Sequence, residues 1–185
     1  MPAEAAQASA PNGPYTIRSY RDIDGPEVGR LIADTYSRFN LQFAAPDELA
    51  KLLGPFQHAG SADPAHRAAI AQVLRALMVY VAEEGGEIVG VLRGRRERLA
   101  SLFVRADHQR RGIGRRLVER FEQESVAEGV GVVRVAATLY AIPFYTAMGY
   151  RKTTGIRNGW SFQGRGLQYQ PMKKVLAQES AAHDP

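Results

Sequence analysis

The sequence predicts an α/β fold, in which helices cover both faces of a mixed, mainly antiparallel twisted sheet. The first observation is a hairpin signal, because two apolar runs, 78–82 and 88–94, flank a turn that contains Gly85-Gly86. The second is the nearly all-apolar run 130–137, which follows a helical segment. We expect this run to be a strand that is buried on both faces and lies parallel to the strand before the helix.

The first half of the chain is expected to hold one strand and three helices. Alternation of polar and apolar residues predicts the strand, and apolar residues at a spacing of three to four predict the helices. Asp22 or Asp24 would cap the first helix, and Pro46 would open the second. The inner face of the first helix is expected to carry Val28, Leu31, Ile32 and Tyr36. The expected elements are a strand over 15–20 and helices over 22–39, 46–54 and 68–77, with a linker over 60–65.

The second half alternates between strands and helices in the same way. A third strand completes a meander with the hairpin, and a long helix follows it and ends at Gly129. A glycine-rich loop over 155–166 is expected to join the last two strands. After the hairpin, the expected elements are a strand over 99–104, a helix over 112–127, a strand over 130–137, a helix over 143–149 and an antiparallel pair over 150–154 and 167–176.

Length and composition restrict the class of protein. The 185 residues suit one domain, which we expect to span 15–176 between loose tails at 1–14 and 177–185. Because the chain has no cysteine, disulfides and thiolate metal sites are excluded, and we expect no metal. No apolar run approaches the roughly 20 residues of a membrane span, and the N-terminus lacks the basic start and apolar core of a secretory signal. We therefore expect a cytoplasmic protein with no membrane partner.

The most informative stretch is Gln109-Arg110-Arg111-Gly112-Ile113-Gly114, which lies between an expected strand and an expected helix. Two glycines let backbone N–H groups come close to a ligand, and a helix N-terminus adds unpaired donors and partial positive charge. Five arginines and one acid, Asp107, stand between positions 105 and 116. We therefore predict a phosphate cradle for a small polyanion. The alternative is a tight, solvated turn rich in arginine.

The cradle fits neither of two common nucleotide-binding motifs. A dinucleotide site needs G-x-G-x-x-G, but Leu117 stands at the third glycine position, and no G-x-x-x-x-G-K-[ST] is present here. The pattern Q-x-x-G-x-G and the downstream stretch Ala141–Tyr150 (AIPFYTAMGY) instead resemble two elements of the GNAT acetyltransferases (Gcn5-related N-acetyltransferases). These are the acetyl-CoA motif and the A-x-x-F-Y-x-x-x-G-[FY] element, in the family's order and separation. The order of strands and helices extends the resemblance over 15–176.

The resemblance implies a GNAT-like sheet whose strands splay around acetyl-CoA, the co-substrate, in a gap between 99–104 and 132–137. Backbone amides of Phe103 and Val104 would bind the pantetheine arm, and those of 110–115 would bind the pyrophosphate. The Phe103 amide would also stabilise the oxyanion. The implied coenzyme-binding residues are Leu102, Phe103, Val104, Gln109, Arg110, Arg111, Gly112, Ile113, Gly114, Arg115, Thr138 and Tyr145.

Tyr145 is the candidate general acid, because the resemblance implies this role and a neutral phenol can protonate a departing thiolate. The alternatives are that it packs or that it only positions the sulfur. Many family members carry a carboxylate early in the strand that matches 99–104, but this chain has none there. The general base is therefore unassigned among Glu97 acting through a water, a water chain, and the histidines His58, His66 and His108. We expect His108 to assist phosphate binding instead.

The family often has Asn at the position of Thr138, whose reach is shorter, and Tyr140 would either shape the acceptor pocket or pack. By resemblance, the acceptor site is built by 35–57 and 155–166. Its candidate residues are Tyr36, Phe39, Asn40, Phe43, Phe56, Arg157, Asn158, Trp160 and Phe162. Trp160 has the strongest claim because it lies in the expected flexible loop. Neither segment has an acidic cluster, so a polycationic acceptor is not indicated.

These features predict an acetyl-CoA-dependent N-acetyltransferase that moves an acetyl group directly to a primary amine of a small molecule or peptide in a ternary complex. The alternative is a non-catalytic acyl-CoA-binding sensor or regulatory module, which the missing carboxylate favours and Tyr145 opposes. Nucleic-acid binding through the arginines is a third interpretation. It lacks interleaved aromatic residues and a recognition helix, so we expect no nucleic-acid partner. A homodimer remains open.

Overall fold

The computed structural model describes residues 14–76 and 78–176, so most of the two predicted tails lies outside it. An eight-stranded sheet has the order β1-β2-β3-β4-β5-β8-β6, and β7 also pairs with β8. The one parallel pair is β4 with β5. The strands are β1 (Tyr15–Ser19), β2 (Met78–Glu84), β3 (Glu87–Arg95), β4 (Arg98–Val104), β5 (Val132–Thr138), β6 (Arg151–Lys152), β7 (Arg157–Ser161) and β8 (Gly164–Val175).

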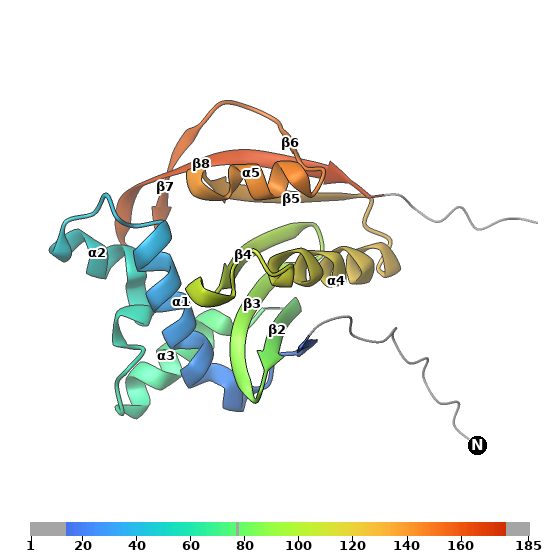
Figure 1. Cartoon of the computed structure of the whole chain (residues 1–185). Coiled ribbons are helices and arrows are strands. Elements are labelled where there is room, and N and C mark those ends of the chain that lie inside the picture. The colour runs from blue at the N-terminus through green and yellow to red at the C-terminus, as the bar shows by residue number, and fades with distance from the viewer. Residues whose placement is uncertain (1–13, 77, 177–185) are drawn as a thin grey trace, which may run out of the picture.

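Helices pack on both sides of this sheet, as the sequence predicts. Figure 1 shows α1 to α3 on one side of β2–β4 and α4 on the other, with α5 beside β5 and β8. The α-helices are α1 (Gly25–Phe39), α2 (Pro46–Leu53), α3 (Pro64–Leu74), α4 (Ile113–Ala127) and α5 (Ile142–Ala147), and 3-10 turns are η1 (Asp22–Asp24), η2 (Gly54–His58), η3 (Ala106–His108) and η4 (Leu139–Ala141).

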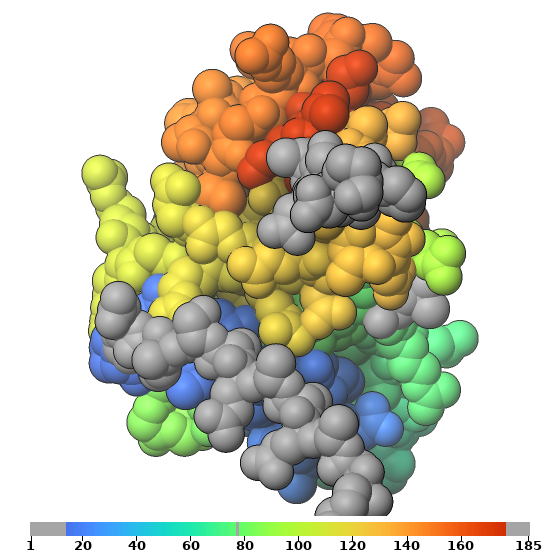
Figure 2. Space-filling view, turned by 90° about the vertical axis from the view of Figure 1, so that its right-hand side faces the viewer, coloured from blue at the N-terminus to red at the C-terminus, as the bar shows by residue number. Residues whose placement is uncertain are grey.

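Two of the three apolar clusters in the described residues hold α1, α3 and α4 to the sheet. On one side, Leu117, Val118 and Phe121 of α4 are fully buried against the strands. On the other side, Val28 of α1 and Leu74 of α3 are fully buried in a second cluster with residues of β2 and β3. One face of α4 therefore packs on the core, and this fixes the N-terminus of α4 at the end of β4. Figure 2 shows the outer side of α4, in yellow, below the orange C-terminal elements.

The parallel pair β4–β5 is short, and this defines the site. The register contains two pairs, Arg98↔Arg134 and Leu99↔Val135, and ends there. The β3–β4 register also shifts between Arg93 and Gly94, whose partners Ser101 and Leu99 leave Ala100 unpaired, which marks a bulge near the start of β4. Beyond Leu99, β4 and β5 therefore diverge, and the predicted splayed sheet is confirmed.

The prediction for the strand over 130–137 is half right. The strand is parallel to β4, but the expected burial on both faces is wrong. Val133, Val135 and Ala137 are buried, whereas Arg134 and Ala136 between them are exposed. Helices cover the face that carries Val133, Val135 and Ala137. The face that carries Arg134 and Ala136 borders the gap and a part of the sheet that no described helix covers.

The bounds of two further elements differ from the sequence prediction. Helix α3 starts at Pro64 rather than 68, because the Asp63 carboxylate accepts a hydrogen bond from the Ala65 N–H at 2.8 Å and caps it. It ends at Leu74, so the predicted extension to 77 is wrong. The expected glycine-rich loop over 155–166 contains strand β7, which forms a hairpin with β8. No described helix combines the length and apolar character that crossing a membrane requires.

Candidate active site

The divergence of β4 and β5 opens a cavity of about 1270 Å³ that runs through the sheet. One half of its lining comes from β4, β5, α5 and the N-terminus of α4. The other half comes from α1, η2 and the β7–β8 hairpin. Most of the predicted coenzyme-binding residues meet here, namely Leu102, Phe103, Val104, Gln109, Arg110, Gly112, Gly114, Arg115, Thr138 and Tyr145. The side chains of the other two, Arg111 and Ile113, point elsewhere.

The cradle is a backbone structure. Arg110 has φ 63° and Gly112 has φ 83°, so two left-handed residues flank Arg111 immediately before α4. Alternation of this kind turns successive N–H groups toward one point, which is how backbone concavities bind anions. A left-handed φ is costly for arginine but not for glycine, and a Cβ on Gly112 would also lie 3.4 Å from the Tyr15 hydroxyl. The Ile113 side chain is buried in the core and anchors this turn from below.

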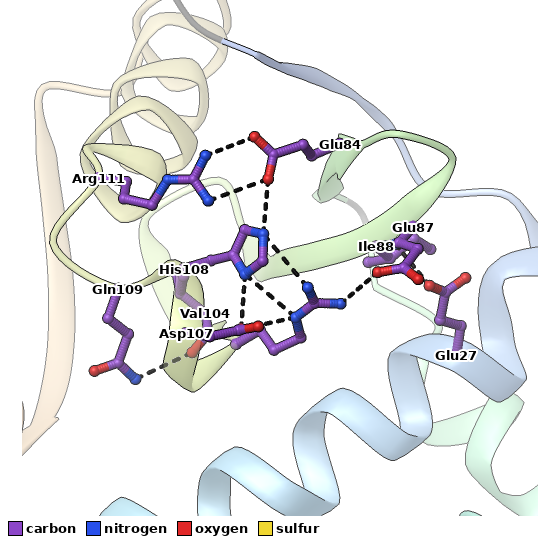
Figure 3. Close-up of polar contacts among 10 residues, drawn as sticks. Glu27, Glu84, Glu87, Ile88, Val104, Asp107, His108, Gln109 and Arg111 are labelled. Carbon is purple, nitrogen blue, oxygen red and sulfur yellow. Dashed lines mark hydrogen bonds and ion pairs between the residues drawn. The ribbon is translucent and has the colours of Figure 1, made fainter.

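Figure 3 shows a polar network that holds the cradle from outside. The Arg111 guanidinium donates to both carboxylate oxygens of Glu84, at 2.7 and 3.1 Å, and the His108 Nε2 lies 2.7 Å from the same carboxylate. The His108 Nδ1 lies 2.7 Å from Asp107, which also accepts from Arg105 Nε at 2.8 Å. Hydrogen bonds with Arg111 and His108 lower the pKa of Glu84, and those with His108 and Arg105 bring the pKa of Asp107 to about 2. The network joins the β2–β3 hairpin to the residues before α4.

This network changes the expected roles of two cations. We expected His108 to assist phosphate binding and Arg111 to bind the coenzyme, but both side chains are paired with carboxylates, and His108 is buried. Arg110 lines the cavity with no ion pair to a described residue, and Arg115 lies at 4.0 Å from Glu119, the limit of an ion pair. Arg110 and Arg115 are therefore the side chains that are free to neutralise a bound phosphate.

The register of β4 determines which backbone N–H groups face the gap. Val104 pairs with Gly90, and the N–H of the next residue, Arg105, donates to the Val89 carbonyl at 2.9 Å. Since N–H directions alternate along a strand, the Phe103 N–H points toward β3, and those of Leu102 and Val104 point toward β5. This geometry argues against the Phe103 amide as the oxyanion donor. We therefore propose the Leu102 and Val104 amides as oxyanion donors instead.

Tyr145 lies on α5 inside the cavity lining, with 4% of its surface exposed. Its ring packs edge-on against Phe144 and Tyr150, at centroid distances of 5.1 and 5.4 Å. Burial raises the pKa of the Tyr145 phenol, because the charged phenolate would lose its hydration. The hydroxyl therefore stays protonated at neutral pH, as a proton donor must.

The other half of the cavity is largely aromatic. Tyr36 packs edge-on against Phe103 at 5.5 Å, and Phe56 does the same with Phe162 at 5.9 Å. Trp160 lies 60% exposed on β7, under the Arg165 guanidinium at 4.1 Å. Among the predicted acceptor residues, those that line the cavity are Tyr36, Phe39, Asn40, Phe56, Asn158, Trp160 and Phe162, whereas Phe43 and Arg157 do not.

The β7–β8 hairpin is docked rather than loose, which corrects the expected flexible loop. Ser161 Oγ donates to the Leu52 carbonyl at 2.8 Å and accepts from the Tyr36 hydroxyl at 2.9 Å. The Gln163 N–H donates to the Lys51 carbonyl at 3.2 Å. Gly164 packs so closely on Leu52 that a Cβ would lie 2.4 Å from its Cγ. The hairpin thus forms a fixed wall of the cavity.

Three contacts bridge the gap from α1 and the cradle to the β5–α5 connection. The Tyr140 hydroxyl donates to Gln109 Oε1 at 2.9 Å, and its ring stacks on Phe39 at 5.2 Å. Asn40 Nδ2 donates to Thr138 Oγ1 at 2.7 Å. The sequence suggested Thr138 and Tyr140 as isolated departures, and no local pattern pairs them with residues so far away in the chain.

No carboxylate of the described residues lines the cavity. Glu97 lies outside it and pairs with Arg134 at 3.3 Å, so it is poorly placed to be a base. His58 and His66 stack on each other at 3.9 Å and also lie outside the lining. His108 does line the cavity, but its two ring nitrogens lie 2.7 Å from the Asp107 and Glu84 carboxylates. We therefore propose that the acceptor amine loses its proton to water.

Comparisons with known proteins agree with this architecture. A family model described as an acetyltransferase (GNAT) domain matches residues 56–176. A GCN5-related N-acetyltransferase of Rhodopseudomonas palustris has 19% identity and a TM-score of 0.71, over 91% of this chain and 100% of that chain. A search of curated proteins found no match.

Two further solved structures contain the coenzyme. PaiA N-acetyltransferase of Thermoplasma acidophilum, in complex with coenzyme A, has 12% identity and a TM-score of 0.64, over 87% of this chain and 98% of that one. YncA of Salmonella typhimurium, with acetyl-CoA, has 20% identity and a TM-score of 0.58, over 90% and 96%. At these identities the structures establish the fold, while the family model covers most of the chain. The chain therefore belongs to the GNAT family of acetyltransferases.

Proposed function

We propose that this protein transfers an acetyl group from acetyl-CoA to a primary amine of a small molecule or peptide, with both substrates bound at once. The observation that carries the proposal is the two-pair contact between β4 and β5. It leaves one continuous cavity with a backbone cradle on one side and an aromatic chamber on the other. Two substrates that enter from opposite sides would meet beside Tyr145.

The chain's own groups suit the coenzyme. The amides around Arg110 and Gly112 would hold the pyrophosphate, and Arg110 and Arg115 would neutralise its charge. The N–H groups of Leu102 and Val104, which β5 leaves unpaired, would bind the pantetheine arm and the thioester oxygen. The coenzymes bound to PaiA and YncA support acetyl-CoA as the co-substrate.

The proposed reaction is direct. The neutral amine attacks the thioester carbonyl carbon, the C–S bond breaks, and the Tyr145 hydroxyl gives its proton to the departing sulfur. The amine loses its proton to water, and water re-protonates Tyr145. Holding both reactants in one cavity removes much of the entropic barrier of a bimolecular step. Amides aimed at the developing oxyanion lower the barrier further.

Calorimetry with coenzyme A and acetyl-CoA, followed by thiol release with a panel of amines, amino acids and peptides, tests this function. We expect binding of both coenzymes and amine-dependent release of thiol. No heat of association with either coenzyme would overturn the proposal.

The second candidate is a non-catalytic acyl-CoA sensor. The lack of a carboxylate in the described cavity lining favours it. Tight coenzyme binding with no thiol release for any amine in the panel would replace the enzyme by the sensor.

A further inference from the structure

Five basic residues occupy directly paired positions on five neighbouring strands. Arg95 of β3 pairs with Arg98 of β4, and Arg98 pairs with Arg134 of β5. Arg134 pairs with Lys173 of β8, and Lys173 pairs with Arg151 of β6. Paired residues of adjacent strands project to the same face of a sheet, so these five side chains form one row, which we call the basic ladder.

The basic ladder lies on the open face of the sheet. All five residues are exposed, and their neighbours Val133, Val135 and Met172 point to the opposite, buried side. At about 4.8 Å per strand, the row extends over roughly 19 Å. It is therefore long enough to contact several acidic groups at once.

The fold gives no reason for this row. Like charges at directly opposite positions destabilise a sheet. Among the described residues, one carboxylate pairs with the ladder, Glu97, which lies 3.3 Å from Arg134. Neutral residues at these exposed positions would serve the sheet better, so the charges point to a ligand that supplies the missing carboxylates.

The basic ladder is continuous with the cavity. Arg98 belongs to both the ladder and the cavity lining. Arg93, two residues before Arg95, also lines the cavity, and its guanidinium donates to the Val73 carbonyl but to no described carboxylate. An anionic molecule lying on the ladder would thus have one end at the cavity.

The surroundings of the ladder favour a polypeptide over a nucleic acid. The flanking positions on the same face are aliphatic, with Val132 and Val175 on one side and Ala136 and Pro171 on the other. Val175 is 71% exposed. Single-stranded nucleic acids bind surfaces where aromatic side chains accompany the basic ones, and none stands at these flanking positions.

We propose that the basic ladder binds an acidic segment of a polypeptide, and that this polypeptide is the amine acceptor. The second clause rests on the acetyltransferase function proposed above. Asp and Glu side chains would lie along the ladder, and the amine would enter the cavity past Arg98. This narrows the acceptor class to acidic peptides or proteins.

Fluorescence anisotropy tests the ladder without acetyl-CoA. The probe is a labelled peptide with a free N-terminal amine and a run of Asp and Glu, and the matched peptide has Asn and Gln in their place. We expect salt-sensitive binding of the acidic peptide alone. In Arg134→Gln/Lys173→Gln the affinity should fall about threefold to tenfold, the range for losing two exposed ion pairs. The control Arg30→Gln/Arg67→Gln removes the same charge from α1 and α3 and should bind like the wild type.

Three outcomes would overturn the ladder proposal: equal binding of the two peptides, an equal loss in the control variant, or tighter binding of single-stranded oligonucleotide than of the acidic peptide. Calorimetry with coenzyme A separates this failure from failure of the acetyltransferase function, because the ladder lies outside the cradle. With activity established, the ladder variant should raise KM for the acidic peptide and leave kcat unchanged. An unchanged KM would show that the polypeptide bound by the ladder is not the amine acceptor.

Discussion

At the scale of single residues, the site depends on a few atoms whose positions the chain cannot vary freely. The Tyr145 hydroxyl lies inside the cavity on a buried ring, and Gly112 takes a backbone conformation that side chains disfavour. A substitution at Tyr145 should leave the cradle unchanged, and a substitution at Gly112 should leave the Tyr145 hydroxyl in place. Chemistry and coenzyme binding can therefore be tested separately.

Removal of the Tyr145 hydroxyl should slow the reaction and leave coenzyme affinity intact. For Tyr145→Phe we expect kcat to fall about 100-fold, within the usual range for a lost general acid, and the Kd for acetyl-CoA to stay within about twofold. Steady-state kinetics and calorimetry measure the two. Tyr150→Phe, whose ring packs on Tyr145 outside the cavity lining, is the control. Unchanged kcat in Tyr145→Phe would remove this residue from the mechanism.

The raised pKa of Tyr145 also predicts the alkaline side of the pH profile. Burial favours the neutral phenol, so the proton donor persists beyond the ordinary phenol pKa of about 10. Between pH 7 and about 10 we therefore expect no decline of the wild-type kcat that is caused by Tyr145. The pH profiles of the wild type and of Tyr145→Phe should have the same shape over this range. A wild-type decline near pH 8 that this variant lacks would contradict the assignment.

Substitution at Gly112 should weaken coenzyme binding. In Gly112→Val, a β-branched residue must adopt a left-handed φ at the point where the amides would approach the pyrophosphate. We expect the Kd for coenzyme A, measured by calorimetry, to rise at least about tenfold. Gly129→Val has comparable strain at the other end of α4, with φ 80°, and should keep normal affinity. Normal affinity in Gly112→Val would argue against the cradle.

At the scale of elements, the acceptor wall is built by docking one hairpin on another part of the chain. The tip of β7–β8 lies against α2 and η2 through hydrogen bonds from the Gln163 N–H and the Ser161 hydroxyl and through Gly164, which has no room for a side chain. This wall was expected as a flexible loop, because glycine-rich sequence signals a loop when its packing partners are unknown.

Gly164→Ala should displace this wall. The new Cβ would lie 2.4 Å from Leu52 Cγ and 2.8 Å from its backbone nitrogen, so the hairpin must move away from α2. We expect KM for the acceptor to rise several-fold, while the Kd for coenzyme A is unaffected. Gly155→Ala, where a Cβ meets open space, is the matched control. The docking argument fails if Gly164→Ala and Gly155→Ala give the same acceptor KM.

At the scale of the whole molecule, the polar network of Figure 3 joins the β2–β3 hairpin to the cradle and links stability to pH. His108 and Arg105 hold the pKa of Asp107 at about 2, below the unfolded value of about 3.9. A lowered carboxyl pKa stabilises the fold above the unfolded pKa, and this contribution is lost as the pH falls toward 2.

Asp107→Asn should therefore destabilise the protein in a pH-dependent way. We expect its Tm to lie below that of the wild type at pH 7 and the difference to shrink as the pH falls from about 4 toward 2. Thermal unfolding followed by circular dichroism measures this. Asp34→Asn, an exposed acid of α1 with no ion pair among the described residues, is the control. A Tm difference that is constant with pH would show that the ion pairs of Asp107 contribute nothing.

The sequence by itself determined the order of the strands and helices other than β7, the position of the turn that we propose as the cradle, and the family. Each of these is written in local patterns, such as the spacing of apolar residues, Gly112 before a helix, or the Ala141–Tyr150 stretch. These patterns can be read without knowledge of distant contacts, because they reflect backbone conformation and the burial of one face of each element.

The tertiary structure decided what depends on long-range pairing. The register of β3 with β4 shows that the Phe103 N–H points toward β3, so the oxyanion donors that we propose are the Leu102 and Val104 amides. The Arg111 side chain pairs with Glu84, which is distant in sequence, and is therefore not available to a phosphate. The segment expected as a loop docks on Leu52 and forms a wall of the cavity. The basic ladder, too, exists only when five strands are placed side by side. Directions of N–H groups and pairings of charges follow from which strands meet, and a single strand does not encode its neighbour.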